Sequence, residues 1–144
     1  MQVTATKSSI STEAAHRAVA AAVEKATDLE VRINAAVVDQ SGLLMAFLRM
    51  HGAFLHSIDI AIDKAYTAAS FGLPTSKWDE LLPIDSLLRD GIQHRPRMVA
   101  FGGGLPIIEK NEVIGGLGVS GGSEEQDELC SKAGIDMIHS LLTD

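Results

Sequence analysis

The sequence contains few cysteines, aromatic residues and prolines. Its single cysteine, Cys130, allows neither an internal disulfide nor a cysteine-based metal cage. Aromatic residues make up 4% of the 144 residues, so the core has to be built from Ala, Val, Ile and Leu. Four prolines against 13 glycines indicate tight turns and close backbone approaches. A chain of this length can nevertheless bury a core without covalent or metal staples.

Positive charge and long apolar runs are also scarce. The formal net charge is −7, and the densest basic cluster, Arg95 and Arg97 around Pro96, is too small for a nucleic-acid surface. No run approaches the roughly 20 apolar residues of a membrane span. The N-terminal residues do not show the basic start and following apolar segment of a signal peptide, so none is expected. We therefore expect a cytoplasmic protein with no nucleic-acid or membrane partner.

Helical patterns occur at both ends of the chain and in its middle. Residues 1–10 are polar and predict a flexible N-terminus, followed by a single domain over residues 11–144. Ser11 or Thr12 can cap a first helix that ends near Ala26. Ser57 can cap a second helix that ends near Phe71, before a proline. The last helix opens at Ser123, which with Gln126 has the spacing of a capping box, and places Cys130 on its apolar face.

Five segments have the composition and length of short strands, and short irregular helices are expected over residues 76–91. The predicted strands are Val31–Asp39, Leu43–Met50, Met98–Phe101, Leu105–Lys110 and Val113–Ser120. Links of hairpin length indicate antiparallel pairing. The sequence therefore predicts an α+β domain of order α-β-β-α-(short α)-β-β-β-α, with a five-stranded antiparallel sheet.

The stretch from Arg49 to Thr75 points most directly to function. It places Arg49 and Lys64 at opposite ends of an apolar, small-residue run, with His51 and His56 between them. One interpretation is a solvated arginine and a lysine whose amine reaches the surface. The other is a pair of cations that hold a carboxylate, with Lys64 able to act as a base when desolvated. The alanines beside Lys64 leave room for a small molecule.

Three blocks of the sequence together resemble the GlcG/HbpS family, to which the C-terminal domain of PduO also belongs. They are VVDQSGLLMAFLRMHGA, SIDIAIDKAYTAASFGLPT and FGGGLPIIEKNEVIGGLGVSGGSEEQDELCSKAG, and the match spans residues 12 to 142. The resemblance implies a profilin-like fold that assembles into homo-oligomers. It also implies haem as a cofactor, since some members bind haem and some are linked to haem degradation or redox sensing.

The chain departs from the family pattern at His51, where the family usually has aspartate between methionine and glycine in an RMDGA block. An imidazole in place of an acid changes the charge and the ligand chemistry of the expected site. A second departure, Asn111-Glu112 in place of Asp-Gly or Asn-Gly before the last strand, is interpreted as surface variation.

The candidate site residues follow from this stretch and from the resemblance. His16, His51 and His56 are candidate axial ligands of haem, and relatives that use a histidine of the first helix favour His16. The remaining pocket residues expected from the family match are Thr67, Phe71, Gly103, Gly104 and Pro106. His56 with Asp59 and Asp63 could bind a divalent metal, but a polar outer helix face explains the set better, so no metal site is expected.

Three functions remain open. The first is binding of haem or another planar, carboxylate-bearing small molecule. The second is a small catabolic enzyme, an isomerase, tautomerase or hydrolase acting on a carbonyl-containing acid, with Arg49 as anchor and Lys64 and His51 as acid and base. The third is a non-catalytic oligomeric assembly partner.

Overall fold

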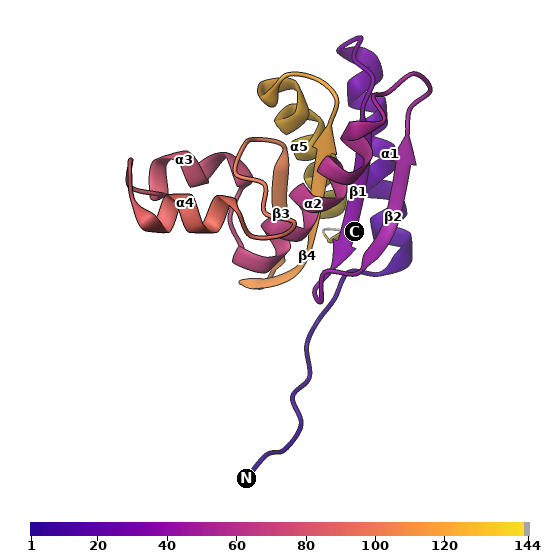
Figure 1. Ribbon diagram of the computed structural model, residues 1–144. Coiled ribbons are helices and arrows are strands. Elements are labelled where there is room, and N and C mark those ends of the chain that lie inside the picture. The colour runs from indigo at the N-terminus through magenta and orange to yellow at the C-terminus, as the bar shows by residue number, and fades with distance from the viewer. Residues whose placement is uncertain (143–144) are drawn as a thin grey trace.

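The computed structural model describes residues 1–142 and contains one antiparallel sheet with helices on both faces (Figure 1). The strands are β1 (Asn34–Asp39), β2 (Leu44–Arg49), β3 (Gly104–Glu109) and β4 (Glu112–Ser120). They lie in the order β2-β1-β4-β3, so the first and last strands of the sequence are neighbours at its centre. This arrangement confirms the α+β class.

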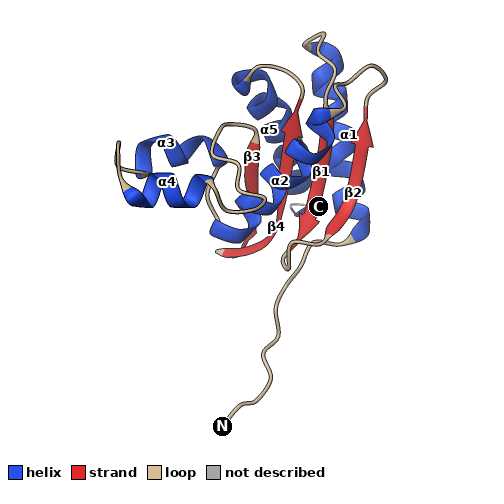
Figure 2. Ribbon diagram, viewed as in Figure 1, coloured by secondary structure: helices blue, strands red, loops and turns tan. Residues whose placement is uncertain are grey.

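Helices form two layers around the sheet (Figure 2). On one face lie α1 (Thr12–Asp28) and α5 (Glu124–Leu142), and on the other lies α2 (His56–Phe71). Between α2 and β3 the chain passes through a 3₁₀ turn (Thr75–Lys77), α3 (Trp78–Leu81) and α4 (Leu87–Gln93), which project from the side of the sheet (Figure 1).

The predicted helix starts were correct at two of three places. Ser11 accepts a hydrogen bond from the amide of Ala14, and Ser123 and Gln126 form the predicted reciprocal capping box. The prediction that Ser57 caps α2 was wrong. That helix begins one residue earlier without a side-chain cap, because the backbone carbonyls of Phe54 and Leu55 accept the first amide hydrogen bonds.

The sheet has four strands within residues 1–142, not the predicted five. Met98–Phe101 does not pair, because the amide of Val99 donates to the hydroxyl of Thr67 on α2 at 3.2 Å instead of to a strand. Arg97, just before it, has a positive φ of 66°, which turns the chain out of an extended path. The segment therefore runs along α2 and not along β3.

The packing of α2 on the sheet explains the run of alanines in this helix. Ala61, Ala65 and Ala69 face the glycines of β4, and the carbonyl oxygen of Ala61 lies where a Cβ on Gly118 would be. The same holds for Gly116 and the carbonyl oxygen of Ala65. Backbone therefore fills the space beside the alanines that the sequence suggested for a ligand.

The opposite core, between the sheet and the pair α1 and α5, is aliphatic as the composition predicts. Cys130 is fully buried in it, which confirms the expected packing role of this thiol. The chain enters this core at Ile10, whose amide donates to the carbonyl of Ile114 at 2.9 Å. The residues before Ile10 are exposed and extend away from the domain (Figure 1).

Candidate functional site

Lys64 lies inside the molecule and not at its surface. Its side chain is 1% exposed, and its Nζ atom donates to the carbonyl of Val119 at 2.8 Å and to a carboxylate oxygen of Asp127 at 3.1 Å. The other carboxylate oxygen of Asp127 accepts the amide of Gly122 at 2.8 Å. Burial lowers the pKa of Lys64 and raises the pKa of Asp127, while their mutual attraction opposes both shifts.

The glycine segment 102–104 closes over this ion pair. The amide of Gly102 donates to Glu124 at 2.7 Å, and the carbonyl of Gly103 accepts from the hydroxyl of Ser131. A Cβ on Gly103 would come within 2.6 Å of the Lys64 Nζ atom, and its φ of 126° favours glycine. The segment therefore bends tightly over the buried lysine, and the amides of Gly102 and Gly104 and the carbonyl of Gly103 are hydrogen-bonded within the protein.

The loop between β2 and α2, residues 50–55, collects exposed groups of several kinds. The imidazole of His51 is exposed, as is that of His56 at the start of α2, and Phe54 and Leu55 are 68% and 77% exposed. Arg49, at the end of β2, donates to the carbonyl of Ala53 at 2.9 Å. The loop thus offers imidazole and apolar surface beside a guanidinium.

Two further residues hold this loop in place. Asn34 on β1 is fully buried and donates to the carbonyl of Phe54 at 3.2 Å. Its Oδ1 atom has no hydrogen-bond partner within residues 1–142. Arg32 covers Gly52, whose φ of 86° suits glycine, and its guanidinium occupies the space that a side chain there would need. A second guanidinium therefore lies against the loop.

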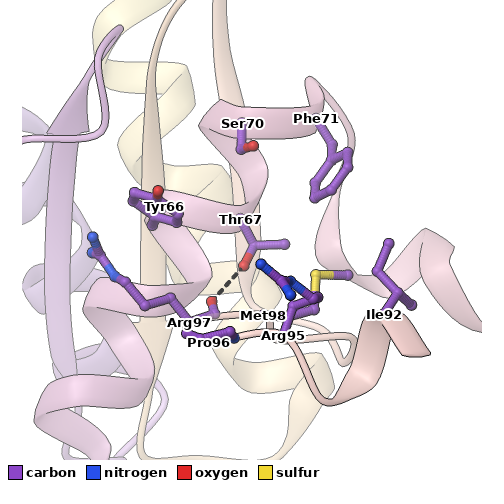
Figure 3. A pocket seen from close by; sticks show the side chains of 9 residues that line it. All are labelled: Tyr66, Thr67, Ser70, Phe71, Ile92, Arg95, Pro96, Arg97 and Met98. Atoms are coloured by element: carbon purple, nitrogen blue, oxygen red, sulfur yellow. Dashed lines mark hydrogen bonds between the residues drawn. The ribbon is translucent and has the colours of Figure 1, made fainter. Parts of the chain in front are cut away.

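A pocket of about 200 Å³ lies on the outer side of α2 (Figure 3). Thr67 and Phe71 line it from the helix, and Arg95 and Met98 line it from the segment that follows α4. The hydroxyl of Thr67 donates to the carbonyl of Arg97 at 3.0 Å, which fastens that segment to the helix. This pocket is separate from the buried Lys64.

A sequence model of the family described as "Haem degrading protein HbpS-like" matches residues 10–136. The chain belongs to this HbpS-like family. The resemblance found in the sequence is thereby confirmed. An uncharacterized 15.0 kDa protein encoded in the dhaT–dhaS intergenic region of Citrobacter freundii is 41% identical over 132 residues, which cover 90% of this chain and 93% of that protein.

Two solved structures are similar to this HbpS-like chain over most of its length. The Klebsiella pneumoniae protein ORFY has a TM-score of 0.89 at 35% identity, covering 97% of each chain. The PduOC:heme complex has a TM-score of 0.83 at 33% identity, covering 90% of this chain and 94% of that chain. A relative with the same fold has therefore been crystallised in complex with heme.

The predicted site residues of this HbpS-like chain fall in several places. Lys64 and Gly103 meet in the interior, whereas His51 lies in the exposed β2–α2 loop, with Arg49 at the end of β2 and His56 at the start of α2 on either side of it. Thr67 and Phe71 line the pocket on α2. The remaining three are His16, exposed on α1, Gly104, whose amide donates to Thr75, and Pro106, in the edge strand β3.

Sequence reasoning missed Asp127, Arg32 and Arg95. Asp127 had a usable signal, because it lies on the same stripe of α5 as the buried residues Cys130, Gly134 and Ile138. A charge in a buried stripe demands a partner of opposite sign. Arg32 and Arg95 had no such signal, since their neighbours come from other elements.

Metal-holding clusters and membrane-spanning helices are both absent from the described part of this HbpS-like chain. Within residues 1–142 no three His, Cys, Asp or Glu side chains gather closely enough to hold a metal ion. None of the helices in that range has the length and hydropathy that a bilayer crossing requires.

Proposed function

We propose that this protein binds haem through a surface imidazole, with the β2–α2 loop as the favoured site. Membership of the HbpS-like family and the heme complex of the similar PduOC structure support haem as the ligand. The observation that favours the loop is the combination of imidazole, apolar and guanidinium groups on one exposed segment.

The groups of the loop match the chemistry of haem. Haem iron takes a neutral imidazole as an axial ligand, and His51 and His56 are both exposed. The macrocycle needs apolar contacts, which the exposed side chains of Phe54 and Leu55 can supply. Guanidinium groups pair well with carboxylates, and Arg32 and Arg49 could each hold one propionate.

The rest of the structure supports the loop as a fixed site. Its backbone is held by the side chains of Asn34 and Arg49, so the imidazoles are carried on a segment with a defined path. The Oδ1 atom of Asn34, which is buried beside the loop, has no hydrogen-bond partner within the described chain and could accept one from a bound group.

The exposed imidazole of His16 on α1 is the alternative axial ligand. It is supported by the resemblance to relatives that use a histidine of the first helix. It lies on a different element from the β2–α2 loop. The two sites therefore make separate predictions for substitution.

Hemin titration of the purified protein tests the proposal. We expect the protein to shift the Soret band of hemin. The affinity for hemin should be at least tenfold lower in the His51→Ala, His56→Ala double variant. His139→Ala, an exposed histidine at the end of α5, is the matched control and should titrate as the parent does. A loss confined to His16→Ala would move the site to α1, and a band that no histidine substitution changes would rule out imidazole ligation.

The enzymatic alternative receives less support from the geometry. It requires Arg49, His51 and Lys64 to act together, yet the Lys64 amine is paired with Asp127 and 1% exposed while the other two are at the surface.

Assembly into homo-oligomers remains a proposal. Side chains such as Leu87, 91% exposed on α4, could contribute subunit contacts, and light scattering after size exclusion would test this.

A further inference from the structure

The pocket on the outer side of α2 is built by two segments distant in sequence. Tyr66, Thr67, Ser70 and Phe71 come from the helix, and residues 92–98 fold back over them (Figure 3). The hydroxyl of Thr67 joins the two, because it donates to the carbonyl of Arg97 and accepts from the amide of Val99. The pocket therefore has walls fixed by hydrogen bonds to a buried side chain.

The two arginines of the pocket differ in their electrostatic state. Arg97 has its guanidinium 3.6 Å from the ring centre of Tyr66 and 3.0 Å from a carboxylate oxygen of Asp63. Its charge is therefore compensated and its position is set by stacking. Figure 3 shows it turned toward Tyr66, whereas the Arg95 guanidinium lies among the other lining side chains.

Arg95 retains an unused charge. Arg95 is exposed, and within residues 1–142 its guanidinium makes no hydrogen bond or ion pair, although it lines the pocket. The hydroxyl of Ser70, exposed on the same pocket, has no partner in that range either. A charged fork and a hydroxyl thus face a space whose other walls include the apolar side chains of Phe71, Ile92 and Met98.

We infer that this pocket binds a small organic monocarboxylate with an apolar body. The planar guanidinium of Arg95 pairs with a carboxylate through two parallel hydrogen bonds, and the apolar walls exclude water from the body of the ligand. The volume of about 200 Å³ is below the roughly 300–1,000 Å³ of pockets for drug-sized ligands, so the ligand is smaller than those. Inorganic phosphate would leave the apolar walls unused.

This site is distinct from the proposed haem site and does not depend on it. No histidine lines the pocket, and none of its residues belongs to the β2–α2 loop. Substitution of Arg95 should therefore leave hemin binding unchanged, so the two proposals can fail separately.

The test is a titration of the ¹⁵N-labelled full chain with benzoate, followed by amide chemical shifts. We expect saturable shifts at Ser70, Phe71, Met98 and Val99, at least tenfold weaker binding in Arg95→Gln, and an intermediate loss in Arg95→Lys, which keeps the charge but not the fork. Arg17→Gln, at an exposed arginine of α1, is the control and should bind benzoate as the parent does.

Two comparison ligands make the test specific. Benzamide has the shape of benzoate without its charge, and inorganic phosphate has charge without an apolar body. The inference is overturned if benzamide binds as tightly as benzoate, if phosphate does so, if Arg95→Gln binds benzoate unchanged, or if benzoate causes no saturable shift at these amides.

Discussion

The amine of Lys64 on α2 and the carboxylate of Asp127 on α5 meet at 3.1 Å, with side chains only 1% and 4% exposed. The two helices lie on opposite faces of the sheet, so the contact joins the two layers near the end of β4, where Val119 supplies the second acceptor. A buried ion pair stabilises a fold only when both partners are present, because either charge alone keeps its desolvation cost.

We predict strong coupling between Lys64 and Asp127. Lys64→Met or Asp127→Asn alone should lower the free energy of unfolding by about 3–5 kcal/mol, since each leaves one buried group without its partner. The double variant should cost clearly less than the sum of the two. Urea unfolding of the four proteins measures this difference, and additive effects would contradict the prediction.

The exposed pair Lys132 and Asp136 on α5 is the matched control for that cycle. Its charged atoms are 2.9 Å apart, but the side chains are 65% and 59% exposed. Solvent screening should keep the coupling between Lys132→Met and Asp136→Asn below about 0.5 kcal/mol.

Gly118→Ala should destabilise the protein by about 1–3 kcal/mol or more, because the new Cβ would collide with the backbone of Ala61 and Ala65. The helix would have to move away from the sheet to relieve the contact. Gly91→Ala is the control, since Gly91 lies in α4 with nothing within 4 Å of the added Cβ. It should be neutral or stabilise by up to about 1 kcal/mol. Thermal or urea unfolding distinguishes the two, and equal effects would show that α2 does not pack as described.

Cys130 should make folding stability fall at alkaline pH. Burial, aided by the nearby Asp127, raises the pKa of its thiol from 9.0 to about 11. Between these values the folded state keeps a proton that the unfolded state has lost, so the stabilisation is complete below pH 9 and is lost as the pH rises through about 11. The loss should amount to about 2–3 kcal/mol.

The comparison with Cys130→Ala isolates this contribution, because lysines and the tyrosine titrate in the same pH range. The difference in unfolding free energy between parent and variant should change across pH 9 to 11 and stay constant from pH 7 to 8. A thiol reagent at pH 8 should react with the parent only after denaturant is added. Rapid reaction of the native protein would show that the thiol is accessible.

The helices could be predicted from sequence because their signals are local. The cap at Ser11, the capping box of Ser123 and Gln126, and the buried alanine stripe of α2 each lie within a few turns of the chain. Four of the five predicted strands exist for a similar reason, since hairpin turns and apolar content lie side by side in sequence. The family could also be inferred, because its blocks retain their order.

That Met98–Phe101 is not a strand could not be predicted from sequence. Its composition suits a strand, but a hydroxyl 32 residues away accepts a backbone hydrogen bond that a neighbouring strand would otherwise have accepted. Thr67 takes the amide of Val99 that a strand would have paired, and nothing near Val99 in the sequence reports this. The position of Arg95 against the pocket has the same origin, as the bond from Thr67 to Arg97 folds that segment onto α2.

The sequence by itself determined the aliphatic composition of the core, the helices with their local caps, the α+β class and the family. Tertiary structure alone decided that Lys64 faces inward to Asp127, 63 residues away, while Arg49 and His51 stay at the surface. The physical reason is that a charge can be buried only where folding brings a counter-charge and a backbone acceptor to it. The buried stripe of α5 indicates that Asp127 needs a counter-charge, but nothing along the chain identifies Lys64 as that partner.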